Sequence, residues 1–237
     1  MLPLEQQNIL RQEYRAAHPG WRPATELYAE LVRGQLGSEA RLLDLGCGRG
    51  GLVEQLDYPP VKMVGIDPDI GSLATHRLPL PRAAAMSDHL PFADDSFDLV
   101  FASWLLEHLA LPSLTFESVA RVLRPGGVFV FITPNARNPL SALNRGLGRF
   151  ADLQGWLVRR IYGRSSPDTF PTFYRANTAS ALVGIGRRYG LVLSELHFVR
   201  DPTYLAFTPW LFRMTGWLED HLSEERSLHL VGLFRLE

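Results

Sequence analysis

The sequence predicts an α/β fold in which a mostly parallel sheet is covered by helices on both faces. Short apolar runs typical of buried strands alternate with segments of helical periodicity over most of the chain. The first of these runs leads into a glycine-rich turn at 46–51, and the second ends at Asp67, roughly 20 residues after Asp44. A strand, a glycine turn and a later acid in this order are typical of folds that bind a nucleoside.

Each expected element follows from a local pattern of apolar residues. The expected helices cover residues 4–17, 25–36, 50–56, 70–76, 114–123 and 178–189. The expected strands cover residues 40–45, 61–67, 83–86, 97–103, 128–133, 191–199 and 229–236. Proline and glycine at 125–127 end the fifth helix, because neither continues a helix well. Residues 201–228 are expected to be a long connection between the last two strands.

Composition limits the function classes. The chain of 237 residues has a net charge of −1, so no basic excess indicates a nucleic-acid partner. Cys47 is the single cysteine, which fits a reducing compartment. The N-terminus lacks the pattern of a signal peptide, and no apolar run approaches the ~20 residues that span a bilayer. We therefore expect a cytoplasmic protein without stable membrane insertion.

The glycine turn alone does not identify the nucleoside. Gly46, Gly48 and Gly51 fit the dinucleotide pattern G-x-G-x-x-G, which leaves NAD and S-adenosylmethionine open. A carboxylate at Asp44 would repel a pyrophosphate, whereas it would attract the cationic sulfonium and α-ammonium groups of S-adenosylmethionine. The alternative is that Asp44 only accepts hydrogen bonds from backbone amides in the turn. Asp44 therefore favours S-adenosylmethionine without excluding a dinucleotide.

Three later motifs add to this pattern: the segment from Asp88 to Val100, the pair Glu107-His108, and the segment from Leu123 to Gly127. With them the sequence resembles a class I S-adenosylmethionine-dependent methyltransferase of the type that modifies small molecules. The resemblance is strong over residues 38–135 and weak in the tail. It implies a Rossmann-like, doubly wound, seven-stranded, mostly parallel sheet with an antiparallel last strand, to which 191–199 and 229–236 would contribute.

The resemblance also implies a cofactor site for S-adenosyl-L-methionine, built from four segments. Its residues would be Asp44, Gly46, Cys47 and Gly48 in the turn, Ile66, Asp67 and Pro68 after the second strand, Asp88, His89 and Leu90 after the third, and Ser103 and Trp104 after the fourth. Asp67 would bind both ribose hydroxyls, and Asp88 the adenine amino group. The alternatives are a helix N-cap for Asp67, a plain turn residue for Asp88 and an apolar filler for Cys47.

On the acceptor side, His108 is the candidate general base, which methyl transfer needs only if the acceptor is a hydroxyl or a weakly acidic carbon. The alternative is an exposed histidine at a helix end. Tyr14, Tyr174 and Arg175 are candidate substrate contacts, and no metal is expected. The fourth strand does not end in the Asp/Asn-Pro-Pro-aromatic sequence of enzymes that methylate nucleic-acid amino groups, which argues against DNA bases as acceptors.

Residues 136–172 are expected to form a helical insertion within one domain of residues 1–237 that begins with the N-terminal helices of 1–37. Apolar residues from Leu143 to Ile161 recur there at helical spacing, with several arginines beside them. The favoured interpretation is an apolar stripe packed on the domain. The alternative is a lid, or a peripheral contact with anionic lipids through 141–164. The rival functions are a nicotinamide-dependent oxidoreductase and a binding module without catalysis, and nothing in the sequence indicates the oligomeric state.

Overall fold

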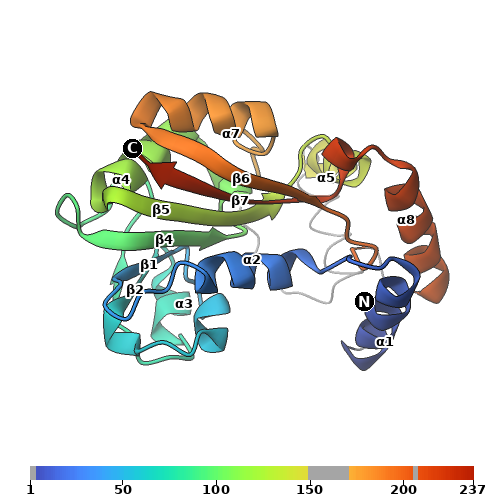
Figure 1. The fold of residues 1–237 in the computed structure, drawn as a ribbon, viewed down its shortest axis with the longest axis horizontal. Helices are drawn as coiled ribbons and strands as arrows, with labels where there is room; N and C mark the ends of the chain where they lie inside the picture. The colour runs from blue at the N-terminus through green and yellow to red at the C-terminus, as the bar shows by residue number, and fades with distance from the viewer. Residues whose placement is uncertain (1–3, 149–170, 205–207) are drawn as a thin grey trace.

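A computed structural model describes residues 4–148, 171–204 and 208–237 (Figure 1). Its centre is a seven-stranded sheet with the order β3-β2-β1-β4-β5-β7-β6. The strands are β1 (Leu42–Leu45), β2 (Met63–Asp67), β3 (Arg82–Ala84), β4 (Phe97–Ser103), β5 (Leu123–Pro134), β6 (Leu191–Val199) and β7 (His229–Leu236). Neighbours from β3 to β5 pair in parallel, and β7 runs antiparallel between β5 and β6. The predicted fold class, including the antiparallel last strand, is confirmed.

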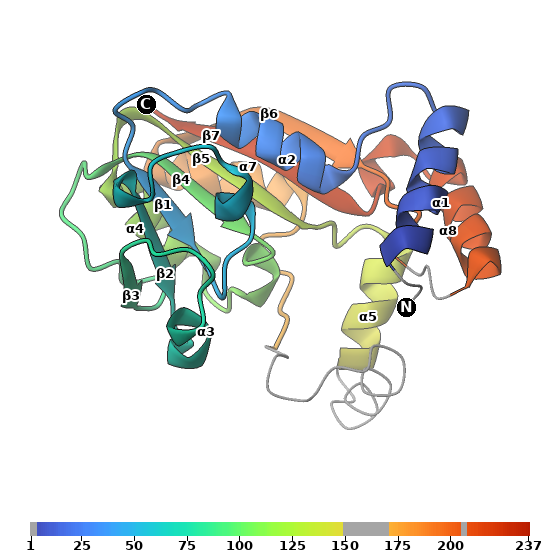
Figure 2. The same ribbon diagram turned by 90° about the horizontal axis from the view of Figure 1, so that it is seen from below.

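Helices cover both faces of this sheet (Figure 1). The described helices are α1 (Leu4–Ala17), α2 (Ala24–Arg33), α3 (Ile70–Ala74), α4 (Pro112–Val122), α5 (Pro139–Gly148), α7 (Ala179–Gly186) and α8 (Pro209–His221). Of these, α2 packs on one face of the sheet and α4 and α7 on the other. Successive strand residues face opposite sides, so Leu42 belongs to the core beneath α2 while Leu43 belongs to the core beneath α4 and α7. Figure 2 shows α1, α5 and α8 grouped beyond the carboxyl ends of the parallel strands.

Two expectations about single elements were wrong. The helix expected at 50–56 is only a 3₁₀ turn, η1 (Leu52–Gln55), which follows two glycines at positive φ. Strand β5 begins at Leu123 rather than 128, because Leu123 already pairs with Phe97 and the ladder shifts register before it resumes at Leu99. The expected connection 201–228 does join β6 to β7, and it contains α8, which is capped by the side chain of Thr208. A helix N-terminus at the glycine turn therefore plays no part in the site.

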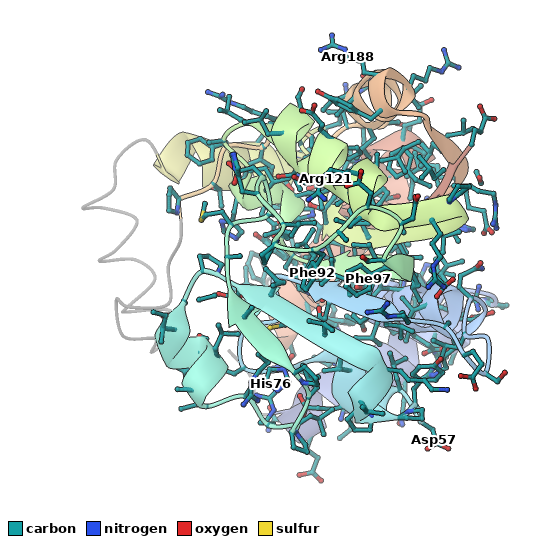
Figure 3. All side chains as sticks on the ribbon, turned by 90° about the vertical axis from the view of Figure 1, so that its left-hand side faces the viewer. Asp57, His76, Phe92, Phe97, Arg121 and Arg188 are labelled. Carbon is teal, nitrogen blue, oxygen red and sulfur yellow. The ribbon has the colours of Figure 1, made fainter. Side chains whose placement is uncertain are left out.

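The end of the loop that follows β3 packs against β4 and α4 (Figure 3). Phe92 packs edge-on against Phe97 with ring centroids 4.9 Å apart. Arg121 of α4 donates hydrogen bonds to the carbonyls of Phe92 and Leu90 at 2.7 and 2.8 Å. These contacts fix the segment that carries Asp88.

Of the predicted insertion at 136–172, the structure describes α5 and the returning segment from Pro171 onward. Of the stretch 141–164, to which the lipid alternative belongs, residues 141–148 are part of α5 and residues 149–164 lie outside the described residues, so the lid and lipid alternatives stay predictions. Among the described residues, no helix has the length and apolar character required to cross a membrane.

Candidate functional site

A cavity of about 510 Å³ lies at the carboxyl ends of β1, β2 and β4. This volume is typical of a small-molecule or cofactor site. The predicted residues that line it are Gly46, Gly48, Ile66, Asp67, Pro68, Asp88, Ser103, Trp104 and His108. Four segments that are distant in the sequence therefore meet at one cavity, as expected for the end of a parallel sheet.

Asp67 is held in place by backbone amides. Its Oδ2 accepts a hydrogen bond from the amide of Gly48 at 2.9 Å, and its Oδ1 accepts one from the amide of Asp69 at 2.8 Å. Asp69, and not Asp67, caps α3, since its side chain accepts from the amides of Gly71 and Ser72. The N-cap alternative for Asp67 is therefore wrong, and its carboxylate is presented to the cavity.

The glycine turn brings bare backbone to the cavity wall. The amides of Gly46 and Cys47 both donate to the carbonyl of Ile66, at 2.8 and 3.0 Å. Gly46 and Gly48 have φ of +78° and +50°, which glycine adopts without strain. The side chain of Cys47 faces Gly65, where an added Cβ would lie 2.7 Å from its Sγ. Cys47 is thus buried packing within the turn and does not line the cavity.

Asp44 lies behind the glycine turn, is only 4% exposed and, contrary to the prediction, does not itself line the cavity. Within the described part of the chain its carboxylate accepts no hydrogen bond. Burial, and secondly the charge of Asp67, raise the pKa of Asp44 to about 7. The alternative that Asp44 accepts bonds from turn amides is therefore wrong. A buried carboxylate without a donor is suited to a cationic ligand group, which is what the predicted cofactor would supply.

The Asp88 segment contributes only part of what the sequence predicted. Asp88 lines the cavity beside Ser87, whose hydroxyl lies 2.9 Å from that of Thr115. The side chain of His89 is 84% exposed, and it lies beside Asp88 with a ring nitrogen 3.2 Å from the carboxylate. Leu90 belongs to the core beneath α4. His89 and Leu90 do not line the cavity.

The other half of the cavity is mostly apolar. It is lined by Trp104, Leu105, His108, Leu109, Ala110, Leu111, Pro171 and Phe173. Trp104 has a φ of +56°, an uncommon backbone conformation for a bulky residue. Its ring packs edge-on against His229 at 4.9 Å between centroids. His108 is the ionisable side chain among these lining residues.

His108 is held by the segment that returns after the insertion. Its Nδ1 donates a hydrogen bond to the carbonyl of Pro171 at 2.9 Å, which in the neutral ring places the lone pair on Nε2. The amides of Phe173 and Tyr174 both donate to the carbonyl of Glu107, at 2.7 and 3.2 Å. These bonds close one side of the cavity with residues from two distant parts of the chain.

The three predicted substrate residues are not brought together. Arg175 lies at the rim, where its guanidinium donates to the carbonyl of Ala110 at 2.6 Å and lies 5.6 Å from the Phe173 ring centroid. The side chain of Tyr174 is buried beside this rim. Tyr14 is elsewhere, because its hydroxyl donates to Asp220 of α8 at 2.6 Å. Tyr14 therefore packs α1 against α8 and does not line the cavity.

Sequence reasoning missed Ser87, Thr115 and Phe173, and it also missed Glu107 as the anchor of the returning segment. Phe173 follows a segment without strands, so no pattern connected it to β4. Ser87 was adjacent to Asp88 and could have been found by extending that motif by one residue.

Comparisons with known proteins agree with this geometry. The model of a family described as methyltransferase domain matches residues 43–131. A ubiquinone biosynthesis O-methyltransferase of Rhizobium etli (strain CIAT 652) is 33% identical over 110 residues, which are 44% of either chain. A trans-aconitate 2-methyltransferase of Variovorax paradoxus is 37% identical over 136 residues, 53% of this chain and 50% of that protein. The chain thus spans about half the length of these curated relatives.

A solved structure extends the likeness beyond the matched segment. An S-adenosylmethionine-dependent methyltransferase from Mesorhizobium loti has a TM-score of 0.60 and 20% identity, over 90% of this chain and 98% of that one. At this level of identity the likeness shows the fold.

Proposed function

We propose that the chain carries a class I S-adenosylmethionine-dependent methyltransferase domain and that it transfers the methyl group of S-adenosylmethionine to a hydroxyl of a small, largely apolar acceptor. The observation that carries this proposal is the cavity itself. Its polar half is lined by Gly46, Gly48, Asp67 and Asp88, and its apolar half contains His108. The buried carboxylate of Asp44 belongs to the strand that leads into the glycine turn.

The residues of the polar half fit the cofactor. Asp67 would bind the ribose hydroxyls, while Gly46 and Gly48 leave room for the chain that carries the sulfur. Asp44 would face the positive charge of the methionyl end. Asp88, Ile66 and Pro68 would surround the adenine ring, as proposed from the sequence. When bound, the cofactor supplies an activated methyl group, so the protein mainly has to align the acceptor and exclude water.

The residues of the apolar half fit an uncharged acceptor. Trp104, Leu105 and Phe173 would surround its apolar body, with Arg175 and Tyr174 at the rim. His108 would take the proton of the acceptor hydroxyl at Nε2, because its Nδ1 already donates to Pro171. The printed names of the relatives from Rhizobium etli and Variovorax paradoxus, an O-methyltransferase and a methyltransferase of trans-aconitate, support a small-molecule acceptor.

We further propose that residues 1–237 act as one domain, since α2 contributes to the core beneath the sheet. The thiol of Cys47 is free and buried, which supports action in a reducing compartment such as the cytoplasm.

Two measurements test the proposal. Thermal unfolding with S-adenosylhomocysteine should shift the midpoint upward, whereas NADH should leave it unchanged. Incubation of the protein and labelled S-adenosylmethionine with small-molecule extracts should yield a product that has gained one labelled methyl group. Stabilisation by NADH alone would support the oxidoreductase alternative. Cofactor binding without transfer to a broad panel of hydroxyl compounds would support a non-catalytic module.

A further inference from the structure

Residues 171–177, all of which the structure describes, return to the cavity after the insertion and form neither helix nor strand. Pro171 and Phe173 of this segment line the cavity, and the carbonyl of Pro171 accepts the hydrogen bond from the ring of His108. A segment without a backbone ladder of its own keeps its place through bonds and packing against other parts of the chain. Whatever fixes this segment therefore also fixes one wall of the cavity and the candidate base.

Three buried side chains hold the far end of the segment. Nδ2 of Asn177 donates to the hydroxyl of Thr133 at 2.6 Å, and that hydroxyl donates to Oε2 of Glu107 at 3.0 Å. Thr133 and Asn177 are fully buried, and Glu107 is 5% exposed. Nδ2 of Asn177 also donates to the carbonyl of Pro134 at 3.0 Å, which fixes the orientation of the amide because a carbonyl oxygen only accepts. We call these three side chains the Glu107–Thr133–Asn177 chain.

This chain joins both sides of the acceptor half to one point of the sheet. Thr133 lies near the end of β5, and Glu107 belongs to the 3₁₀ turn η3 (Leu106–His108), which carries His108. Asn177 directly precedes the residue that caps α7. The Thr133 hydroxyl is the central group, since it accepts one bond and donates the other. Bonds of this kind are stronger in the low dielectric of the interior than in water.

We propose that Thr133 is a positioning residue for methyl transfer, which through Glu107 and Asn177 fixes the tautomer and direction of the candidate base. In the unchanged protein Nδ1 of His108 carries the ring proton, and Nε2 keeps the lone pair that takes the proton of the acceptor. Once the segment is released, the ring can adopt the other tautomer, whose Nε2 is protonated and accepts nothing. The inference rests on the proposed function for the role of His108, but the tautomer can be measured without an acceptor.

Thr133→Val and Thr133→Ser form the test pair. Valine keeps the shape of threonine and removes both hydrogen bonds, whereas serine keeps the hydroxyl and lacks only a methyl group. Long-range ¹H–¹⁵N spectra of histidine-labelled protein at about pH 8, where a free imidazole is neutral, show which ring nitrogen carries the proton. The signal of His108 is identified by its absence in His108→Gln. The unchanged protein and Thr133→Ser should show the Nδ1–H form, while Thr133→Val should shift toward the Nε2–H form that histidine prefers in water.

Turnover with the acceptor found by the product screen is the second measurement. Thr133→Val should lower kcat roughly tenfold to a hundredfold, which is less than the full loss of a general base, and Thr133→Ser should restore it. Affinity for S-adenosylhomocysteine should be equal in all three proteins, because the Glu107–Thr133–Asn177 chain lies outside the cavity lining. Asn177→Leu breaks the other end of the chain and should produce the same tautomer shift, so the test does not depend on the folding of one variant.

Thr215→Val is the matched control. Thr215 of α8 is 1% exposed, and its hydroxyl donates to the carbonyl of Leu211 at 2.9 Å, outside the cavity lining. This variant also loses a buried hydrogen bond, so its unfolding temperature should fall. Its His108 spectrum and its turnover should match those of the unchanged protein, which separates positioning from a general loss of stability.

The outcomes separate the two proposals. An unchanged His108 tautomer or an unchanged kcat in Thr133→Val overturns the positioning role, and so does a Thr133→Ser variant that behaves like Thr133→Val; the methyltransferase proposal stands in each case. If the unchanged protein transfers no methyl group from S-adenosylmethionine, the proposed function fails, and the positioning role in methyl transfer fails with it even where the spectra show the tautomer shift.

Discussion

The amide nitrogen of Gly48 lies 2.9 Å from Oδ2 of Asp67. This bond joins the glycine turn after β1 to the acid at the end of β2, so the two motifs form one structural unit. Even a Cβ added at Gly48 would lie 4.0 Å from the same oxygen, which is an ordinary van der Waals distance. The turn therefore does not push against the carboxylate. The bond fixes the direction of Asp67 before any ligand arrives.

Asp67→Ala should weaken binding of S-adenosylhomocysteine by about 1–3 kcal/mol, because it removes a preorganised acceptor for the ribose hydroxyls. Calorimetry of the purified variant measures this loss. Asp69→Ala is the control, since Asp69 caps α3 without lining the cavity. It should cost about 1 kcal/mol of stability and leave the affinity unchanged. Equal affinities for Asp67→Ala and the unchanged protein would contradict the ribose assignment.

Cofactor affinity should rise with pH and level off above about pH 7. In the free protein burial and Asp67 raise the pKa of Asp44 to about 7. A cationic ligand group beside Asp44 would lower that pKa, so binding below pH 7 must release a proton. Affinity should therefore increase by at most about tenfold per pH unit up to that point.

Calorimetry near pH 6 in two buffers of different ionisation enthalpy measures the released proton directly. Asp44→Asn should bind more weakly at high pH and lose this pH dependence. An affinity of the unchanged protein that is equal at about pH 6 and pH 8 would remove Asp44 from the cationic end of the site.

Local sequence patterns predicted most strands, but they could not predict features that depend on contacts between distant segments. The bounds of β4, β6, β7 and α1 agree with prediction, because each begins and ends at a change of periodicity or at a turn residue. The 3₁₀ turn η1 was expected as a longer helix, since apolar spacing cannot show that the preceding glycines adopt positive φ. The bulge at the start of β5 depends on pairing with β4 and has no local sign.

The residues of the candidate site form the same two groups: those that local patterns could place and those whose position depends on long-range contacts. Asp67 and Ser103 could be placed at the cavity because strand ends converge by topology. Tyr14, in contrast, was chosen by residue type, and its position depends on a contact with Asp220 some 200 residues later in the chain. The bond between Pro171 and His108 likewise joins two segments that no periodicity relates.

His108→Gln should reduce turnover on a hydroxyl acceptor by about 10²- to 10⁴-fold and leave cofactor affinity unchanged, because the general base is lost while the polar half of the cavity stays intact. Steady-state rates measured with the acceptor found by the product screen test this. His197→Gln on β6 is the control, since that exposed ring lies beside Glu195, outside the cavity lining. A variant with unchanged turnover at every pH would show that the acceptor needs no base from His108.

Stability should fall as pH rises from about 4.5 to 7, in part because of Glu219. This fully buried carboxyl accepts hydrogen bonds from Asn138 at 2.6 Å and from the amide of Leu228 at 3.2 Å, and so links α8 to the start of α5 and to the segment before β7. Burial is the largest cause that raises its pKa from 4.5 to about 7. Within that window the folded state binds more protons than the unfolded state, so rising pH favours unfolding.

Urea unfolding at several pH values between about 4 and 8 measures this slope. Asp44 adds a contribution of the same sign, because its pKa is also raised to about 7. Glu219→Gln should make the slope shallower and lower the stability at acid pH by about 1 kcal/mol, since the amide nitrogen cannot accept the bond from Leu228. Glu225→Gln, an exposed residue paired with Arg137, should keep the full slope. A Glu219→Gln slope as steep as that of the unchanged protein would show that this carboxyl is ionised in the folded state throughout the window.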